Sequence, residues 1–248
     1  MLPVGRGLER FVSLEGCFNF RDVGGRPTQA GRRIRTGLLF RSDALHHMTP
    51  SDVERVRDVL GVRTVVDLRS GVERETEPPA ALCAPPVALH HVPFFDRDRS
   101  SAGAGASLSL AQLYALMMQF ARAPIVQAVE ILASADSAAV FHCAAGKDRT
   151  GVLAAVVLGA LDVPDELIVD DYADTRHALE RILARLRESR SYDYVFDELP
   201  PETLHAEPET MADLLAHVRA RYGSMRGYLR ESGVAEPTLA RLASRLVE

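Results

Sequence analysis

A cysteine and an arginine lie six positions apart in the stretch 140–151, which reads VFHCAAGKDRTG. Cys143 follows a short apolar run that predicts a buried strand, and Arg149 precedes a long apolar run that predicts a buried helix. Backbone N–H groups in a short loop that opens a helix can converge on one anion, and the helix N-terminus adds partial positive charge. The spacing therefore indicates a phosphate site.

The predicted loop supplies what a phosphoryl-transfer reaction needs. Arg149 offers a planar fork that matches two phosphate oxygens. The positive field of such a loop favours the thiolate, so Cys143 is expected to attack phosphorus. Thr150 is expected to hydrogen-bond this thiolate, and His142 to order the loop. The phosphate-binding residues are Ala144, Ala145, Gly146, Lys147, Asp148 and Arg149.

Three aspartates are candidates for the general acid that protonates the leaving oxygen. Asp148 lies inside the loop, where the charge of a bound phosphate dianion favours a protonated carboxyl group. Its structural alternative is an ion pair with Lys147 or an interaction with the helix N-terminus. Asp67 ends a predicted strand, where ligands gather in open α/β sheets, and Asp96 follows another strand. We expect Asp148 to be the acid, with Asp67 second and Asp96 third.

The loop has two other possible interpretations. A cysteine at the end of a buried strand is often only a small apolar side chain, but the arginine spacing and Gly146 favour a phosphate site. The pair Gly146-Lys147 also suggests a nucleotide-binding P-loop. That motif needs glycine five residues earlier and Ser or Thr after the lysine. Those positions hold Phe141 and Asp148, which excludes it.

Four segments of the chain share a pattern with a known family. The first is His-Cys-x5-Arg-Thr at 142–150, with Gly-Lys-Asp-Arg inside it. The others are Asn-Phe-Arg-Asp-Val-Gly-Gly at 19–25, Arg-Ser-Asp at 41–43 and Val-Val-Asp-Leu-Arg-Ser at 65–70. In this order they resemble the bacterial atypical protein-tyrosine phosphatases of the protein tyrosine phosphatase B type, and the resemblance covers most of the chain.

The resemblance implies hydrolysis of phosphotyrosine on proteins, and it leaves phosphoserine, phosphothreonine and phosphoinositides open as further substrates. It makes Arg21 and Asp22 part of a scaffold beside the loop, where the alternative is a turn with a salt bridge. Lys147 would add positive charge for a multiply phosphorylated head group, or would only tune the loop. In many phosphatases of this fold, an aspartate on a loop placed like that of Asp96 supplies the acid.

A sheet must hold this loop, and apolar periodicity predicts one. Uninterrupted apolar runs at 62–68 and 138–141 predict strands buried on both faces, which is typical of a parallel sheet. We therefore predict an α/β fold, with a mostly parallel central sheet of four or five strands, helices on both faces and a helical C-terminal region. Further strands are expected at 18–20, 37–40 and 87–94. Helices are expected at 49–60, 73–79, 108–121, from 124, at 152–161, from 162 or 165 to about 188, and at 209–222, 224–232 and 236–247.

We expect one phosphatase domain over residues 1–248. Within it, segment 189–208 combines aromatic residues with prolines, so it is either a lid or rim over the site or a packed connector. The net charge of −5 gives no attraction to nucleic acid. No N-terminal signal and no apolar run of about 20 residues is present, which favours a cytoplasmic protein without a transmembrane segment.

No metal or cofactor is expected, because Arg149 and the loop amides supply the positive charge. Two other classes of function stay open, namely a phosphate-binding module without turnover and a loop-cysteine enzyme of sulfur transfer or arsenate reduction. An intact cysteine argues against the first, and the arginine spacing argues against the second. Three cysteines are too few for a disulfide framework, although Cys17 or Cys83 could approach Cys143 in space.

Overall fold

A five-stranded sheet forms the centre of the protein in a computed structural model, which describes residues 10–94, 108–189, 192 and 201–248. Strand β1 is antiparallel to β2, and the other three pairings are parallel. The predicted mostly parallel sheet is therefore confirmed. In spatial order, the strands are β1 (Arg21–Asp22), β2 (Leu39–Ser42), β5 (Ala138–His142), β3 (Val62–Asp67) and β4 (Ala88–His91).

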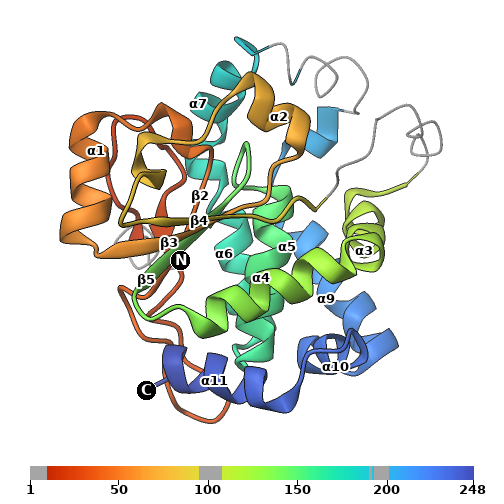
Figure 1. Cartoon of the computed structure of the whole chain (residues 1–248). Coiled ribbons are helices and arrows are strands. Elements are labelled where there is room, and N and C mark those ends of the chain that lie inside the picture. The colour runs from red at the N-terminus through yellow and green to blue at the C-terminus, as the bar shows by residue number, and fades with distance from the viewer. Residues whose placement is uncertain (1–9, 95–107, 190–191, 193–200) are drawn as a thin grey trace, which may run out of the picture.

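Helices cover both faces of the sheet, as predicted (Figure 1). One face carries α1 (Pro50–Glu54), which continues as a π-helical turn at Arg55–Val59. Helices α2 (Gly71–Thr76) and α7 (Arg176–Leu186) lie near the carboxyl end of the sheet. The other face carries α3 (Leu110–Phe120), α4 (Arg122–Ser134), α5 (Asp148–Ala160), α6 (Asp165–Ala173), α9 (Pro208–Tyr222), α10 (Met225–Glu231) and α11 (Glu236–Leu246).

Strand β5 divides the core into its two layers, because successive side chains of a strand point to opposite faces. Ala139 and Phe141 belong to the larger apolar cluster, which includes side chains of α4 and α5. Ala138 and Val140 belong to the cluster under α1. This explains why β5 is apolar from Ala138 to Phe141. The carboxyl end of β5 leads directly into the loop that begins at Cys143.

Helix α5 is the central helix of the larger layer and is surrounded by protein. It contacts α3, α6, α10 and strands β2 and β5. Its side chains from Thr150 to Leu158 are all buried, which explains the apolar run without periodicity. The helix therefore holds its N-terminus, at Asp148, at a fixed position at the end of β5.

The predicted single helix from 162 or 165 to 188 is wrong, because α6 and α7 are separate. In a continuous helix, the Asp171 carbonyl would accept the Thr175 N–H. Here that carbonyl accepts Arg21 Nη2 at 2.8 Å, and the Thr175 N–H instead donates to the Tyr172 carbonyl at 3.2 Å. A buried arginine from another element therefore ends the helix, which the local sequence does not show.

The predicted strand at 18–20 is also displaced, because β1 begins at Arg21. The N–H groups of Phe18 and Asn19 donate to the carboxylate of Asp43 at 3.0–3.1 Å instead of to a neighbouring strand. The expected strand at 87–94 is shorter, and β4 is confined to Ala88–His91. The predicted helix at 73–79 begins earlier, at Gly71, and ends at Thr76.

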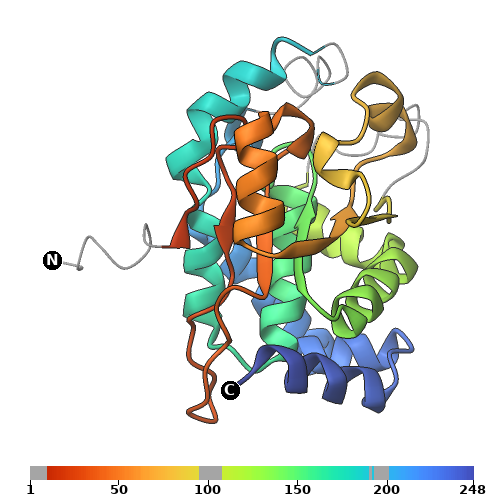
Figure 2. The same ribbon diagram turned by 60° about the vertical axis from the view of Figure 1, so that its left-hand side comes forward.

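The strand expected at 37–40 is displaced to β2, Leu39–Ser42, whereas the other expected helices overlap their predicted ranges. Thr49 caps α1 and forms a capping box with Asp52. The chain turns at 31–33, since Pro27 pairs with Arg33 in an antiparallel bridge. Beside this turn, residue 34 pairs with residue 247, so the turn and the C-terminus lie together (Figure 2). Among the described residues, no one helix combines the length and apolarity of a membrane span, although the bent pair α3 and α4 meets both criteria jointly.

Candidate active site

The thiol of Cys143 lies at the carboxyl end of β5, against the first turn of α5. The side chain is 2% exposed, and Thr150 Oγ1 donates to its Sγ at 3.1 Å. Thr150 is itself fully buried. The sulfur therefore accepts a hydroxyl donor and lies beside the N-terminus of a helix, which carries partial positive charge. The two residues therefore meet as the sequence predicts, although they stand seven positions apart.

The loop carbonyls are bound from outside the loop. The Ala144 carbonyl accepts Ala44 N–H at 2.9 Å, and Asn19 Nδ2 donates to the carbonyls of Ala145 and Gly146 at 3.2 Å each. Arg41 Nη2 also donates to the Gly146 carbonyl at 2.6 Å. Because N–H and C=O of one peptide point in opposite directions, these contacts turn the loop amides inward, toward a common anion position.

Gly146 is required where the loop passes β2. Its φ is +66°, and a Cβ at this position would lie 2.5 Å from the Ser42 carbonyl oxygen. Both the left-handed conformation and the close approach exclude a side chain. The loop glycine therefore permits the tight contact between the loop and the end of β2.

A buried network of arginines around Asp171 supports these contacts. The Asp171 carboxylate accepts Arg26 Nη2 at 2.8 Å and also bonds Arg41, the residue that holds the Gly146 carbonyl. Burial raises the pKa of Asp171, but these guanidinium groups outweigh burial and hold the pKa well below its ordinary value. Arg21 joins the same network through the Asp171 carbonyl at 2.8 Å, and its Nη1 donates to Asn19, which bonds the loop carbonyls. Arg21 therefore contributes to the scaffold beside the loop, as the resemblance implies.

Asp22, the other residue assigned to this scaffold, does something more local. Its carboxylate accepts the N–H groups of Gly24 at 2.7 Å and Gly37 at 2.6 Å. It therefore pins the two ends of the 24–37 hairpin together. Among the described residues, the Asp22 carboxylate has no hydrogen bond to residues 143–149, so Asp22 supports the site only indirectly.

Arg149 faces a buried carboxylate that the sequence analysis missed. Its Nη1 and Nη2 bond both carboxylate oxygens of Glu73, at 2.5 and 2.8 Å. Glu73 is fixed in turn by a capping box with Ser70 at the start of α2. Burial raises the pKa of Glu73, but Arg149 outweighs burial and lowers it to about 2. The pattern Ser-x-x-Glu signals a helix start, but nothing local to it indicates Arg149.

Asp67 is held in its ionised form, which does not suit the general acid. Its carboxylate bonds the Arg69 guanidinium at 2.9–3.3 Å and lies 3.7 Å from His142 Nε2. Burial raises the pKa of Asp67, but His142 and Arg69 outweigh burial and lower it. His142 Nδ1 lies 3.2 Å from the Cys143 carbonyl oxygen. The Asp67–His142 pair therefore braces the base of the loop and is no source of a proton at neutral pH.

Asp148 is the first residue of α5 and has a more accessible carboxylate than Asp67. Its side chain is 36% exposed, compared with 1% for Asp67. Tyr114 Oη donates to Asp148 Oδ1 at 2.6 Å, and Lys147 Nζ lies 3.0 Å from the same oxygen. The sequence offers no local signal that connects Tyr114 with this carboxylate. Asp96, the third candidate, lies outside the described residues.

Lys147 is the only lysine of the chain, and its side chain is buried. Its Nζ donates to the backbone carbonyls of Thr203 at 2.6 Å and His205 at 3.1 Å. The lysine thus connects the loop to the segment before α9. Its ammonium group therefore makes its described contacts inside the protein.

Segment 189–208 is described only in part. Tyr192 is buried with Ala144 and side chains of α7, and its hydroxyl donates to Glu77 at 3.2 Å. A 3-10 turn, Pro201–Leu204, follows near Lys147. Most of the remaining residues lie outside the described ranges, so the choice between lid and connector stays a prediction.

The other two cysteines lie apart from Cys143. All three thiols are free. Cys17 and Cys83 belong to the apolar cluster under α1, whereas Cys143 belongs to the cluster on the other face of the sheet. Burial raises the pKa of Cys17 well above its ordinary value and that of Cys83 to about 11. Both thiols are therefore poor nucleophiles at neutral pH.

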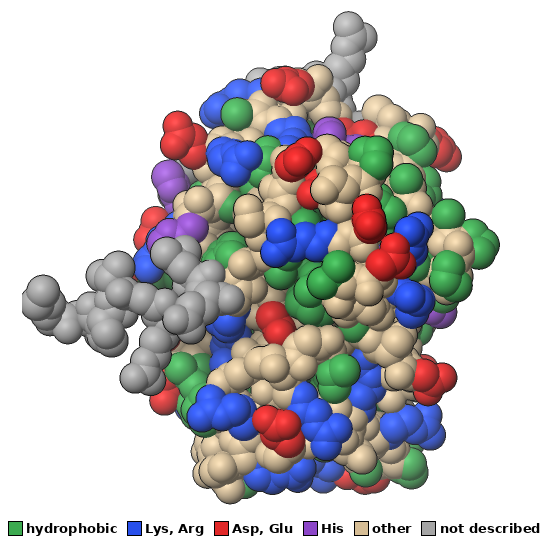
Figure 3. Space-filling view, turned by 90° about the vertical axis from the view of Figure 1, so that its left-hand side faces the viewer, with side chains coloured by type: hydrophobic (Ala, Val, Ile, Leu, Met, Phe, Trp, Pro, Cys, Tyr) green, Lys and Arg blue, Asp and Glu red, His purple; other side chains and the backbone are tan. Residues whose placement is uncertain are grey.

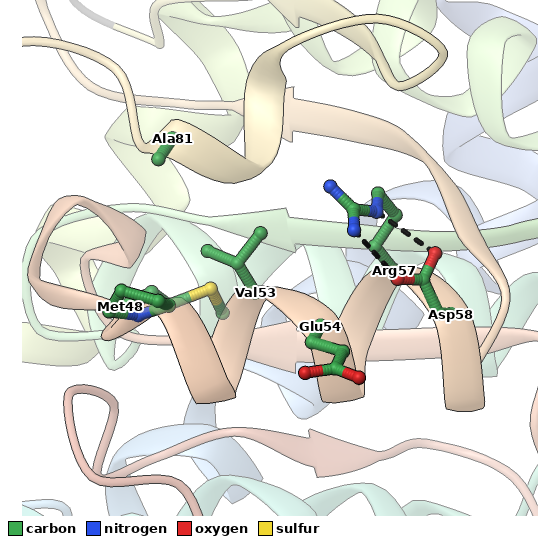
Figure 4. A pocket seen from close by; sticks show the side chains of 7 residues that line it. Met48, Val53, Glu54, Arg57, Asp58 and Ala81 are labelled. Carbon is green, nitrogen blue, oxygen red and sulfur yellow. Dashed lines mark hydrogen bonds and ion pairs between the residues drawn. The ribbon is translucent and has the colours of Figure 1, made fainter.

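Two surface hollows lie elsewhere and include none of the predicted site residues. One, of about 490 Å³, lies along α1, where Arg57 and Asp58 bond each other at its edge (Figure 4). The second, of about 530 Å³, lies between α3 and α9. Acidic and basic side chains are interspersed on the face shown in Figure 3. Within the described ranges, no group of three or more His, Cys, Asp or Glu side chains could hold a metal ion.

The fold and this loop together define a cysteine-dependent phosphatase, and comparison with known proteins agrees. The model described as "Tyrosine phosphatase family" matches residues 12–248, so the chain belongs to that family. The triple specificity protein phosphatase PtpB of Mycobacterium tuberculosis is 28% identical over 278 residues, covering 94% of this chain and 98% of the relative. A tyrosine-protein phosphatase of Nostoc commune is 27% identical over 237 residues, covering 89% and 78%. The predicted bacterial type of protein-tyrosine phosphatase is confirmed.

Proposed function

We propose that the chain hydrolyses phosphomonoesters through a cysteinyl-phosphate intermediate. The observation that carries the proposal is the position of the Cys143 thiol, which accepts a hydrogen bond from Thr150 at the base of a loop whose carbonyls are bound from outside. This arrangement combines a hydrogen-bonded sulfur with inward amides. Arg149 completes the anion site with a guanidinium whose plane is set by Glu73.

The reaction has two steps. The Cys143 thiolate attacks phosphorus, the S–P bond forms, and the P–O bond to the leaving group breaks. The leaving oxygen takes a proton from Asp148. Water then attacks phosphorus and gives its proton to Asp148, the S–P bond breaks, and inorganic phosphate leaves with the thiolate restored. Arg149 and the loop amides stabilise the equatorial oxygens in both steps.

We propose phosphotyrosine on protein as the substrate. The two relatives are named as a tyrosine and a triple specificity phosphatase, which supports this class. The inward position of Lys147 gives no added support for a phosphoinositide, so phosphoserine, phosphothreonine and phosphoinositides are substrates to assay beside it. We also propose a cytoplasmic location, since the three thiols are free, as a reducing compartment favours.

Hydrolysis of p-nitrophenyl phosphate with chelator present tests the mechanism. We expect turnover by the wild type and a loss of at least about a thousandfold in Cys143→Ser. We expect Asp148→Asn to lose the alkaline limb of the pH–rate profile, because that limb reports the acid. Acid quench should trap a ³²P-labelled phosphoenzyme with the wild type and none with Cys143→Ser.

Each alternative has its own outcome. Turnover that survives Cys143→Ser would contradict the thiolate mechanism. A wild type that binds phosphate but hydrolyses neither this ester nor a phosphotyrosine peptide indicates the binding module. Reduction of arsenate with thiol consumption, without ester hydrolysis, indicates the reductase. An unchanged alkaline limb in Asp148→Asn removes Asp148 from the acid's role.

A further inference from the structure

Two tyrosines stand in line behind the Asp148 carboxylate. Tyr114 Oη lies 2.6 Å from Asp148 Oδ1, and Tyr172 Oη lies 2.9 Å from Tyr114 Oη. The three residues come from α3, α6 and the first position of α5. Both tyrosines are 1% exposed, whereas the carboxylate they approach is 36% exposed. The line therefore runs from the core to the mouth of the phosphate loop.

Counting protons gives this line a direction. A phenol carries one O–H donor, and an ionised carboxylate only accepts. Tyr114 uses its one O–H donor in the hydrogen bond to Asp148 Oδ1. The contact between the two phenols then has to be a donation from Tyr172 to Tyr114. Burial, followed by the charge of Asp148, raises the pKa of Tyr114 well above its ordinary value, so this phenol stays a donor across the working pH range.

The line is held rigidly at its inner end. A Cβ built on Gly151 of α5 would lie 3.0 Å from Tyr172 Cδ2, so the Tyr172 ring lies directly on the first turn of that helix. The rings of Tyr172 and Tyr114 meet edge to face, with centroids 6.0 Å apart. Neither phenol can move without disturbing buried packing, so Tyr114 presents its hydroxyl at a fixed point.

The contacts of Asp148 are one-sided. Both the Tyr114 bond and the Lys147 contact fall on Oδ1. Over the part of the chain that the structure describes, Oδ2 makes no hydrogen bond. A general acid with one oxygen anchored carries its transferable proton on the other, in a defined direction.

We propose that Tyr114, supported by Tyr172, is a positioning residue that anchors Asp148 Oδ1 and thereby directs Oδ2 to the leaving oxygen of the substrate. This inference rests on the proposed function, because it assumes that Asp148 is the acid. Tyr114 does not touch the substrate in this scheme. It acts through Asp148, so its removal affects protonation of the leaving group and not binding of the phosphate.

Leaving groups of different basicity separate this role from a structural one. Tyrosine phenolate, with a pKa of about 10, needs protonation more than p-nitrophenolate does. We expect Tyr114→Phe to lower kcat/KM about tenfold for a phosphotyrosine peptide and by about twofold or less for p-nitrophenyl phosphate. Tyr172→Phe, which leaves the Tyr114 bond in place, should show the same substrate bias with a smaller loss.

Tyr228→Phe is the matched control. Tyr228 of α10 is also fully buried, and its hydroxyl donates to the Met118 carbonyl of α3 at 2.7 Å, so the variant removes a buried tyrosine hydrogen bond to the helix that carries Tyr114 without touching Asp148. The ratio of kcat/KM between the two substrates should stay at the wild-type value in this variant. The double variant Tyr114→Phe/Asp148→Asn should lose no more than Asp148→Asn alone, because both changes remove one function.

The outcomes separate the two proposals. If Asp148→Asn loses as much on p-nitrophenyl phosphate as on the peptide, or nothing on either, the assignment of the acid fails. If Asp148→Asn shows the substrate bias and Tyr114→Phe loses equally on both substrates, the acid stands and the positioning role is overturned. A further loss from Tyr114→Phe in the Asp148→Asn background would also overturn it.

Discussion

Glu73 and Arg149 form a two-bond ion pair across 76 residues of sequence, with Nη2 of the arginine 2.8 Å from Oε1 of the carboxylate. The carboxylate side chain is 3% exposed and the guanidinium 15%. The pair connects the first turn of α2 to the phosphate loop. Because five N–H donors of a guanidinium lie in one plane, Glu73 sets the orientation in which Arg149 meets phosphate.

The first prediction concerns activity. Glu73→Gln keeps the capping function at the start of α2, since glutamine also serves there, but removes the charge that orients Arg149. We expect kcat/KM for p-nitrophenyl phosphate to fall roughly tenfold to a hundredfold. Glu75→Gln, at an exposed position of the same helix, should match the wild type. Equal kinetics for the two variants would show that Arg149 needs no such partner.

The second prediction concerns stability and pH. Burial raises the pKa of Glu73, but Arg149 outweighs burial and lowers it from 4.5 to about 2. A depressed folded-state pKa means that the stabilisation is present above about pH 4.5 and is lost as pH falls toward about 2, an amount of the order of 3 kcal/mol. Urea titrations of wild type and Glu73→Gln should therefore converge over this window. A difference in unfolding free energy that stays constant with pH would refute the ion pair.

The third prediction concerns the loop glycine. Gly146→Ala places a Cβ 2.5 Å from the Ser42 carbonyl oxygen at a φ of +66°, whereas Gly61→Ala meets no atom within 4 Å at a φ of +70°. The backbone conformation alone costs about 1–2 kcal/mol, which is what Gly61→Ala should lose in urea unfolding. Gly146→Ala should lose more, and its kcat/KM should fall more than tenfold because the loop must shift. Similar losses in both assays would contradict the close contact.

The fourth prediction concerns the nucleophile. Thr150→Val keeps the volume of the side chain but removes the hydroxyl that donates to Cys143 Sγ. Alkylation of Cys143 by iodoacetamide at neutral pH should slow by up to about tenfold, because one hydrogen bond to the thiolate is lost. Thr150→Ser retains the hydroxyl and should react at the wild-type rate. The rate is read by mass spectrometry of the peptide that contains Cys143. Unchanged alkylation in Thr150→Val would show that the hydroxyl does not stabilise the thiolate.

The fifth prediction uses the single lysine. Lys147 is 4% exposed and donates to the carbonyls of Thr203 and His205, so an amine-reactive ester should label it slowly in the folded protein and rapidly in urea. Lys147→Met should speed amide hydrogen exchange in residues 203–207, since the buried carbonyls lose a charged donor worth about 1–3 kcal/mol. Rapid labelling of Lys147 in the folded protein would contradict its burial. It would show that the ammonium group is accessible and free to contact a phosphorylated head group.

Much of the fold was predictable because the signals are local. The run before Cys143 and the run after Arg149 define a strand, a tight loop and a buried helix within about twenty residues. The start of α1, expected at 49, is local in the same way, since Thr49 caps the helix with Asp52. The strand at 18–20 was misplaced for the opposite reason, because its N–H groups bond the Asp43 carboxylate, more than twenty residues away.

The sequence by itself determined the class of enzyme and the candidate anion loop with its proposed nucleophile, because an anion site at a helix N-terminus needs only residues that are neighbours in the chain. Only the tertiary structure decided which carboxylates have which role. Asp67 is neutralised by Arg69, Glu73 orients Arg149, and Asp148 is met by Tyr114. In the sequence all three are simply acidic residues. Their surroundings are set by burial and by partners from other elements, which packing brings together and local spacing does not encode.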